Sequence, residues 1–191
     1  MDGNPNPKNR TWGGQQYSET RFAIIKWLEK ELPLLKGSVI DIGAGGWNVP
    51  KALLNKKITT YTSFDQKVYG SSKNKVDIYG DIQKMDQSWN NKWNNALCLE
   101  VIECVPNPFA AFDEMYRILK PGGVLLLSAP YNYRAFHRGA WKDPNQGAPD
   151  YWRITKMGLE LLAKKFSKVD VVGFGGTGDH DRFGHCLKAI K

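Results

Sequence analysis

The hydrophobic pattern of the chain begins with an amphipathic segment. From Tyr17 to Leu35, apolar residues recur at the spacing of one helix face, and Pro33 and then Gly37 close the segment. These apolar residues are Phe22, Ile25, Leu28 and Leu32. We expect residues 1–36 to form an N-terminal arm and helix, and residues 37–191 to form one domain.

Short apolar runs bounded by turn or polar residues predict strands. The first five runs are Ser38–Ile42, Thr59–Phe64, Val76–Tyr79, Ala96–Leu99 and Val124–Ala129. Two later runs, Val169–Phe174 and Arg182–Ile190, are joined by a Gly-rich stretch. We expect these two to pair as an antiparallel, hairpin-like edge.

Helical patterns separate the strands. A short helix is expected over residues 47–55, and the clearest helix has Asn107 as its cap and Pro108 in its first turn. Its apolar face comprises Phe109, Phe112, Met115, Tyr116 and Leu119, and Pro121–Gly123 ends it. Thr155 caps a last helix that carries Leu159, Leu162, Ala163 and Phe166. Strands and helices that alternate in this way predict right-handed crossovers and an α/β fold with a doubly wound, mostly parallel sheet.

Length and composition limit the class of protein. The 191 residues fit one domain with one site. No apolar run approaches the roughly 20 residues that cross a bilayer, and Met1–Pro7 lacks the features of a secretory signal. The three cysteines form no CxxC pair. We therefore expect a cytoplasmic protein without membrane contact.

The formal net charge of +8 favours phosphates, nucleic acid or an acidic substrate as partners. No dense run of Lys or Arg occurs, so a solvated basic surface is the favoured interpretation. Base stacking by aromatic side chains nevertheless leaves an RNA or DNA partner as an open alternative. The candidates are Trp12, Tyr17, Tyr131 and Tyr133.

Three acidic residues accompany the predicted strand ends. Asp41 lies beside a glycine cluster, Asp65 ends the second strand and Asp81 ends the third. Ligands of open α/β sheets bind at the carboxyl ends of the strands, and a ribose-binding acid stands roughly 20 residues after the glycine loop. The interval from Asp41 to Asp65 is close to that spacing. Glycines such as Gly43 and Gly45 permit a tight turn and close approach of a ligand, so a nucleoside site is favoured over a plain turn.

Two other nucleotide sites fit less well. The dinucleotide fingerprint G-x-G-x-x-G needs a small final residue for helix packing, and this chain has Asn48 there. The chain also lacks the G-K-[ST] sequence of a P-loop. A dehydrogenase is therefore disfavoured, and a P-loop hydrolase is not supported.

In these residues the sequence resembles the Rossmann-like, class I S-adenosylmethionine methyltransferase superfamily. Val39–Gly45 is similar to its first motif, Leu99–Glu103 to its fourth-strand segment, and Met115–Leu125 to a helix end, turn and strand start of the family. The resemblance implies a seven-stranded Rossmann-like sheet with an antiparallel last strand. It also implies S-adenosylmethionine as cofactor and S-adenosylhomocysteine as product.

The resemblance implies which residues bind this cofactor. The first motif would hold the methionine part, Asp65 the ribose, and Asp81 with Ile82 the adenine. The full predicted set is Asp41, Gly43, Ala44, Gly45, Asp65, Gln66, Asp81, Ile82 and Glu100.

The acceptor side is less defined. His137 and Glu103 are candidate general bases, although a surface histidine and an exposed loop acid are equally ordinary explanations. The segment Pro149–Arg153 resembles an element of some methyltransferases associated with sugars or glycans. It suggests Tyr131, Asp150, Tyr151 and Arg153 as substrate-binding residues. Alternatively, Asp150 pairs with Arg153 and Trp152 packs against the sheet, so that the segment only anchors the loop.

Three functions remain open from these residues. The leading one is methyl transfer to a small-molecule or glycan-like acceptor, and the others are RNA or DNA methylation and a cofactor-binding subunit without catalysis. A metal site at Asp179–Asp181 with His185 is disfavoured, because the spacing defines no ligand geometry and no cysteine completes a zinc pattern. No metal is therefore expected, and the oligomeric state stays open.

Overall fold

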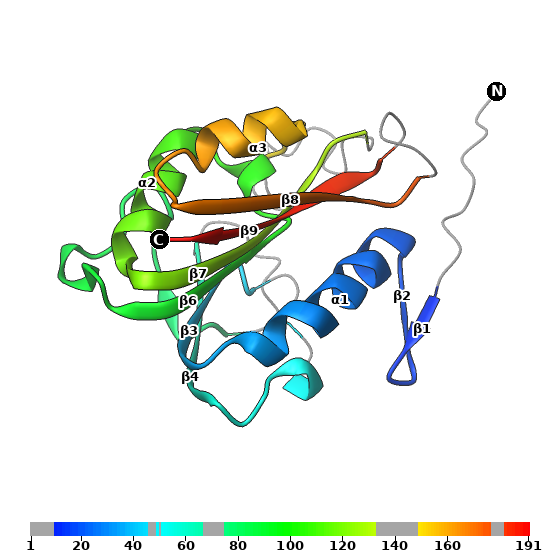
Figure 1. The fold of residues 1–191 in the computed structure, drawn as a ribbon, viewed down its shortest axis with the longest axis horizontal. Coiled ribbons are helices and arrows are strands. Elements are labelled where there is room, and N and C mark those ends of the chain that lie inside the picture. Colours follow the sequence, from blue (N-terminus) through cyan, green and yellow to red (C-terminus); the bar gives the residue numbers. More distant parts are fainter. Residues whose placement is uncertain (1–9, 46–48, 50, 67–74, 133–148, 177–181) are drawn as a thin grey trace.

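The computed structural model of the chain is built around one seven-stranded sheet, with the order β5-β4-β3-β6-β7-β9-β8 (Figure 1). The structure describes residues 10–45, 49, 51–66, 75–132, 149–176 and 182–191. The strands are β3 (Gly37–Ile42), β4 (Ile58–Asp65), β5 (Ile78–Tyr79), β6 (Trp93–Leu99), β7 (Leu119–Pro130), β8 (Lys168–Phe174) and β9 (Gly184–Ile190). Neighbours from β5 to β7 are parallel, and β9 runs antiparallel to both β7 and β8. The predicted fold class, including the antiparallel last strand, is confirmed.

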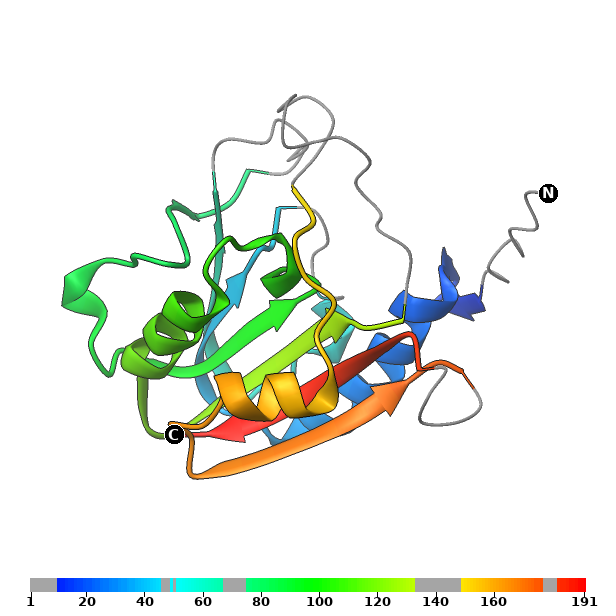
Figure 2. The same ribbon diagram turned by 90° about the horizontal axis from the view of Figure 1, so that it is seen from above.

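Helices cover both faces of this sheet. Helix α1 (Glu19–Glu31) lies on one face, and α2 (Pro108–Ile118) and α3 (Lys156–Leu162) lie on the other (Figures 1 and 2). Because side chains alternate along a strand, Val39 of β3 packs in the cluster with α1, and Ile40 packs in the cluster with α2 and α3. The two clusters form the two halves of a doubly wound core.

Side-chain caps fix where the helices begin. Asn107 Oδ1 accepts a hydrogen bond from the N–H of Ala110 at 3.1 Å, and Thr155 Oγ1 accepts one from the N–H of Gly158 at 3.0 Å. Both predicted caps are therefore confirmed. The apolar face predicted for α2 is buried at Phe112 and Met115, but Phe109 is 52% exposed. Phe109 lies in the first turn of α2.

Three predicted helices are shorter in the structure. The last one, α3, ends at Leu162, so that Ala163 and Phe166, which were predicted to lie on it, follow the helix. The first ends at Glu31 and continues as a 3₁₀ turn over Leu32–Leu34, because Pro33 lacks the N–H that an α-helix needs. The helix expected over residues 47–55 is, in the described part of that segment, only the 3₁₀ turn Lys51–Leu53. There Asn55 Nδ2 donates to the carbonyls of Leu32 and Leu35 and turns the chain back toward α1.

Strand β7 begins earlier than the sequence pattern predicts. Pro121–Gly123 was expected to be a turn, but the strand already starts at Leu119, which pairs with Trp93 of β6. On the other side of β7, Lys191 extends the pairing with β9, since its N–H donates to the carbonyl of Gly123 at 3.0 Å. A sheet neighbour therefore overrides the turn chemistry of this tripeptide.

A small hairpin precedes the first helix and was not predicted. Strands β1 (Arg10–Trp12) and β2 (Gln15–Tyr17) pair antiparallel, joined by Gly13 and Gly14 with positive φ. The indole N–H of Trp12 donates to Glu29 at 2.6 Å, and Tyr17 is buried. These two aromatic side chains thus hold the hairpin on α1 rather than standing free to stack on bases. The arm Met1–Pro7 lies outside the described residues.

Candidate active site

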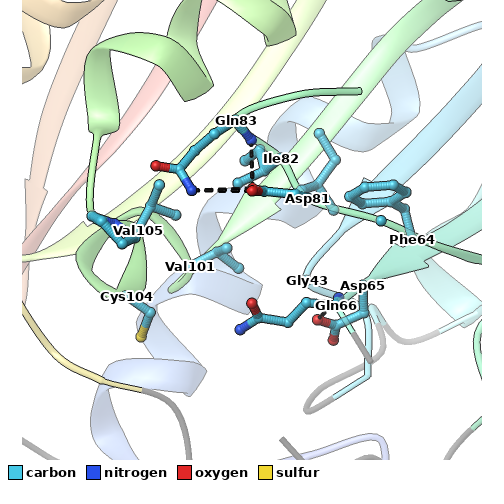
Figure 3. A pocket seen from close by; sticks show the side chains of 13 residues that line it. Gly43, Phe64, Asp65, Gln66, Asp81, Ile82, Gln83, Val101, Cys104 and Val105 are labelled. Carbon is cyan, nitrogen blue, oxygen red and sulfur yellow. Dashed lines mark hydrogen bonds between the residues drawn. The ribbon is translucent and has the colours of Figure 1, made fainter. Parts of the chain in front are cut away.

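The carboxyl ends of four parallel strands meet in one pocket at the switch point of the sheet. From β3 the strand order continues outward to β4 and β5, and from β6 it continues the other way to β7. Figure 3 shows the side chains that line the pocket. They are Ile42, Gly43, Phe64, Asp65, Gln66, Gly80, Asp81, Ile82, Gln83, Val101, Cys104, Val105 and Pro106. Five of the predicted cofactor residues, Gly43, Asp65, Gln66, Asp81 and Ile82, are therefore brought together here.

Gly43 forms the turn that opens the pocket. Its φ is +79°, and its N–H donates to the carbonyl of Phe64 at 2.8 Å. A Cβ added at this position would lie 2.1 Å from Cγ2 of Val101. Both the backbone conformation and the close approach therefore require glycine.

Asp65 ties the end of β4 to the glycine loop. Its Oδ2 accepts from the N–H of Gly45 and its Oδ1 from the N–H of Gln66, both at 2.7 Å. Partial burial raises the pKa of this carboxyl group. Each carboxylate oxygen keeps a second lone pair. The group can therefore also accept hydrogen bonds from the vicinal hydroxyls of a ribose.

The opposite wall combines an acidic and an apolar part. Asp81 Oδ1 accepts from the backbone N–H of Gln83 at 2.8 Å and from its side-chain Nε2 at 3.1 Å (Figure 3). Ile82 is buried beside it, and Phe64 and Val105 add apolar surface. An apolar surface bordered by hydrogen-bonding groups suits a nucleobase, so the carboxylate acceptors and apolar surfaces of this pocket fit S-adenosylmethionine.

The other predicted cofactor residues do not line the pocket. Asp41 is 2% exposed and accepts a hydrogen bond from the Tyr61 hydroxyl, and burial raises its pKa to about 7. Ala44 is buried within the loop, and Gly45 contributes its N–H to Asp65. Asp41 thus supports the loop from within the sheet.

Glu100 stands at the end of β6, also off the pocket lining. Its φ is +55°, which is unusual for a residue with a Cβ. The side chain turns back to the sheet, where Oε1 accepts from Ser128 Oγ at 2.8 Å. Burial raises its pKa to about 7.

Glu103 is buried, with 7% of its surface exposed. The explanation as an exposed loop acid is therefore wrong. None of the described residues forms a hydrogen bond with its Oε2. Burial, followed by the charge of Glu100, raises the pKa of Glu103 well above the usual value. The backbone carbonyl of Glu103 accepts from the N–H groups of Tyr151 and Trp152, at 2.7 and 3.2 Å. A segment about 50 residues further along the chain covers this acid.

That covering segment is Pro149–Arg153. Asp150 and Arg153 form the predicted ion pair with two parallel contacts, one of them from Nη2 to Oδ2 at 2.7 Å. Trp152 does not pack against the sheet as expected. It is 41% exposed, because its indole N–H donates to the carbonyl of Val105 at 2.8 Å and holds the ring over the loop. Tyr151 is 49% exposed.

The remaining predicted residues are only partly covered by the structure. His137 and Tyr133 lie outside the described residues, as does Asp179–Asp181. Tyr131 follows β7, and its ring centroid lies 5.3 Å from that of the buried His185. In the described ranges of the chain, no group of three or more His, Cys, Asp or Glu side chains is placed to hold a metal ion.

Sequence reasoning missed several pocket residues. Cys104 and Val101 line the pocket from the loop after β6, and Gln83 lines it from the loop after β5. Cys104 is only partly buried, whereas Cys98 and Cys186 are buried. The only signal in the sequence for Val101, Cys104 and Gln83 was that they follow predicted strand ends.

Comparisons with known proteins agree with this geometry. A family model described as "Methyltransferase domain" matches residues 17–166. The ubiquinone biosynthesis O-methyltransferase of Histophilus somni is 25% identical over 182 residues, which are 88% of this chain and 66% of that protein. The chain spans only 49% of the length of the corresponding protein of Dechloromonas aromatica.

Solved structures share the fold. A SAM-dependent methyltransferase from Thermotoga maritima matches with a TM-score of 0.60 and 21% identity, over 90% of each chain. A phosphoethanolamine N-methyltransferase from Haemonchus contortus, in complex with S-adenosylhomocysteine, matches with a TM-score of 0.59 and 13% identity. This match covers 88% of this chain and 52% of that one.

Within the described residues, no helix is both long and apolar enough to span a membrane.

The family match covers most of the chain and includes every residue that lines the pocket. The chain belongs to the family described as "Methyltransferase domain".

Proposed function

We propose that the protein transfers the methyl group of S-adenosylmethionine to a hydroxyl group of a small-molecule or glycan-like acceptor. The observation that carries the proposal is the meeting of Gly43, Asp65 and Asp81 in one pocket at the switch point. An oxygen acceptor is favoured because the curated relatives are named O-methyltransferases.

The chain's own residues would bind and orient the two reactants. Asp65 would accept hydrogen bonds from the ribose, Asp81 and Ile82 would border the adenine, and the loop at Gly43 would leave room for the methionine part. When bound, the cofactor supplies an electrophilic methyl group on a sulfonium. Alignment of this group with a nucleophile lowers the barrier by about 7–11 kcal/mol, so positioning is the main task of the site.

The first test measures cofactor binding. Calorimetry should show binding of S-adenosylmethionine and S-adenosylhomocysteine but not of NAD. D65A should weaken both interactions at least tenfold, since the lost hydrogen bonds are charge-assisted. D170N is the matched control, because Asp170 is an exposed acid on β8, away from the pocket. Binding of NAD alone, or equal affinity of D65A and wild type, would refute the proposal.

The second test identifies the acceptor class. Methyl-labelled cofactor is incubated with hydroxyl compounds, amines and RNA at two salt concentrations. We expect label in hydroxyl compounds. Labelled RNA with steeply salt-dependent binding would indicate nucleic-acid methylation instead, and tight cofactor binding without label in any acceptor would indicate a non-catalytic subunit.

A further inference from the structure

A buried acid with an unsatisfied oxygen lies beside the cofactor pocket. Glu103 is only 7% exposed, and its buried Oε2 accepts no hydrogen bond from any residue in the part of the chain that the structure describes. An unsatisfied buried carboxylate oxygen costs free energy in the folded protein. Such a group in a native site calls for a ligand that completes its hydrogen bonding.

The charged groups around Glu103 come from two elements. Glu100 and Cys104 flank it on its own loop, and Asp150 and Arg153 face it from the covering segment. Glu100 is additionally influenced by Arg21 of α1. The three carboxyl groups of Glu100, Glu103 and Asp150 therefore lie together with two guanidinium groups, that of Arg153 and, next to Glu100, that of Arg21. This surplus of negative charge disfavours an anionic ligand.

The loop itself connects this acid to the cofactor pocket. Glu103 lies in the 3₁₀ turn Ile102–Cys104, and both Val101 before the turn and Cys104 within it line the pocket. The loop that carries Glu103 therefore also forms one wall of the cofactor pocket.

We propose that Glu103 is the proton acceptor of the reaction, and that it forms with Glu100 and the Asp150–Arg153 pair a subsite for an uncharged, hydroxyl-bearing methyl acceptor. The inference rests on the proposed methyl transfer. In this inference Glu103 is the general base. The carboxyl groups around it select against acceptors that carry a carboxylate or a phosphate.

The proposed step balances in atoms and charge. The acceptor O–H bond breaks and its proton goes to Glu103 Oε2. The oxygen forms a bond to the methyl carbon, the carbon–sulfur bond breaks, and the electron pair stays on sulfur. A sulfonium, a neutral alcohol and a carboxylate thus become a thioether, an ether and a carboxylic acid.

The electrostatics suit this role. A general base works best when its pKa is near the working pH, and burial with the neighbouring Glu100 charge raises the pKa of Glu103 from its usual value. The same surroundings make the ionised acid a stronger hydrogen-bond acceptor than it would be in water.

The decisive variant is E103Q, which keeps the shape and removes the proton-accepting charge. E160Q serves as the matched control, because Glu160 is an exposed acid on α3. The probes are catechol, methyl glucoside and the more acidic 4-nitrocatechol, with benzylamine as the amine probe. For E103Q we expect kcat with catechol to fall about 10²–10⁴-fold. Binding of S-adenosylhomocysteine, measured by calorimetry, should stay within about twofold of wild type.

The second readout separates a base from a structural residue. Loss of a base matters less when the acceptor oxygen is already ionised, so the rate loss in E103Q should be much smaller for 4-nitrocatechol than for catechol. A merely structural role would reduce both rates equally. If E103Q does not fold, E103D retains the carboxylate but shortens the side chain. It should then reduce turnover of catechol more than that of 4-nitrocatechol.

Three results would overturn this inference while the proposed cofactor binding stands. They are turnover of catechol by E103Q within threefold of wild type, equal losses for the two catechols, and failure of the wild type to methylate any hydroxyl probe. If the wild type does not bind S-adenosylmethionine or its product, the proposed function itself fails.

Discussion

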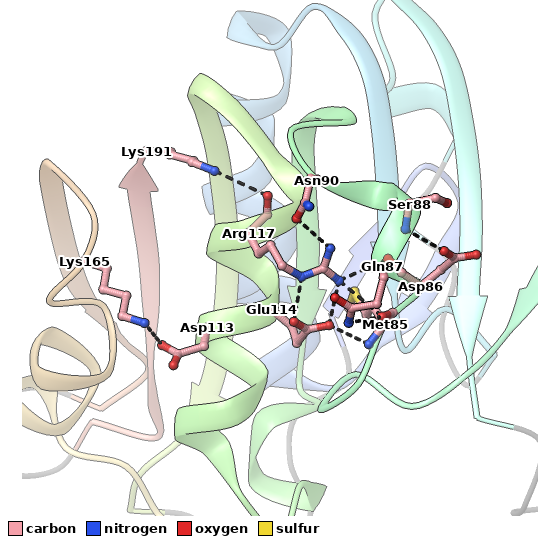
Figure 4. A network of polar contacts seen from close by, with 10 residues as sticks. All are labelled: Met85, Asp86, Gln87, Ser88, Asn90, Asp113, Glu114, Arg117, Lys165 and Lys191. Carbon is pink, nitrogen blue, oxygen red and sulfur yellow. Dashed lines mark hydrogen bonds and ion pairs between the residues drawn. The ribbon is translucent and has the colours of Figure 1, made fainter.

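Glu114 of α2 connects this helix to the segment that follows the pocket wall. Its Oε2 accepts from the N–H of Met85 at 2.6 Å, and Arg117 donates from Nε to Oε1 and from Nη2 to Oε2, both at 2.8 Å (Figure 4). Arg117 also donates to Asn90 Oδ1 and to the carbonyls of Met85 and Asp86. We predict that E114A is among the most destabilising substitutions of a side chain outside the apolar core.

The expected loss of unfolding free energy in E114A follows from these contacts. The alanine leaves the N–H of Met85 without its acceptor and removes two charge-assisted bonds from a guanidinium. The side chains of Glu114 and Arg117 are 14% and 21% exposed. Breaking a fully buried pair costs about 3–5 kcal/mol, but Arg117 keeps its other acceptors here. We therefore expect a loss of about 2–3 kcal/mol, or about 4–12 °C in Tm.

Urea unfolding followed by circular dichroism measures this loss, with D113A as control. Asp113 pairs with Lys165 at 2.8 Å, but the two side chains are 56% and 49% exposed (Figure 4), so D113A should change stability by less than about 1 kcal/mol. The hydrogen bond from Arg117 lowers the pKa of Glu114. The stabilisation is therefore present above the unfolded-state pKa and is lost as the pH falls through the folded-state pKa. Equal stabilities of E114A and D113A at neutral pH would refute the reasoning.

Three further substitutions test other parts of the structure. G43A combines a positive φ with a contact 2.1 Å from Val101, so it should lower the unfolding free energy by about 1–3 kcal/mol, and V101A should restore only part of this in urea unfolding. N107A removes the cap of α2 and should cost about 1 kcal/mol in thermal unfolding without changing S-adenosylhomocysteine binding. Burial raises the pKa of Asp41 to about 7. The contribution of this group to the unfolding free energy is therefore fully present below its unfolded-state pKa and is lost as the pH rises toward 7. D41N should remove this part of the pH dependence of the unfolding free energy. If the unfolding free energies of the variant and the wild type change identically with pH, the prediction is wrong.

The sequence predicted those elements whose signals are local. The caps Asn107 and Thr155 act on N–H groups three residues later, and β3 and β4 coincide with their own apolar runs to within a residue at each end. The start of β7 could not be predicted in this way. It depends on pairing with Trp93 and with the C-terminal Lys191, which lie far away in the sequence.

The cofactor side was predictable because topology does most of the positioning. Parallel strands bring their carboxyl ends to one edge, so Asp65 and Asp81 meet wherever the strand order is right. That Asp41 does not reach the pocket could be recognised only from the register of β3 against β4. Asp41 pairs with Ser63, before the end of β4, and therefore stays inside the sheet, whereas Asp65 is the last residue of its strand.

The acceptor side depended on a contact between distant segments. The sequence offered two opposed interpretations of Pro149–Arg153, as a substrate-binding element and as an anchor for a loop. The hydrogen bonds from Tyr151 and Trp152 to the carbonyl of Glu103 fasten this segment to the loop that carries the buried Glu103, and substrate binding by Asp150, Tyr151 and Arg153 stays a prediction. Anchoring thus creates the environment that raises the pKa of this acid. If Glu103 is the proton acceptor, the segment contributes to the reaction through the burial that it imposes, even where its own side chains do not contact the acceptor.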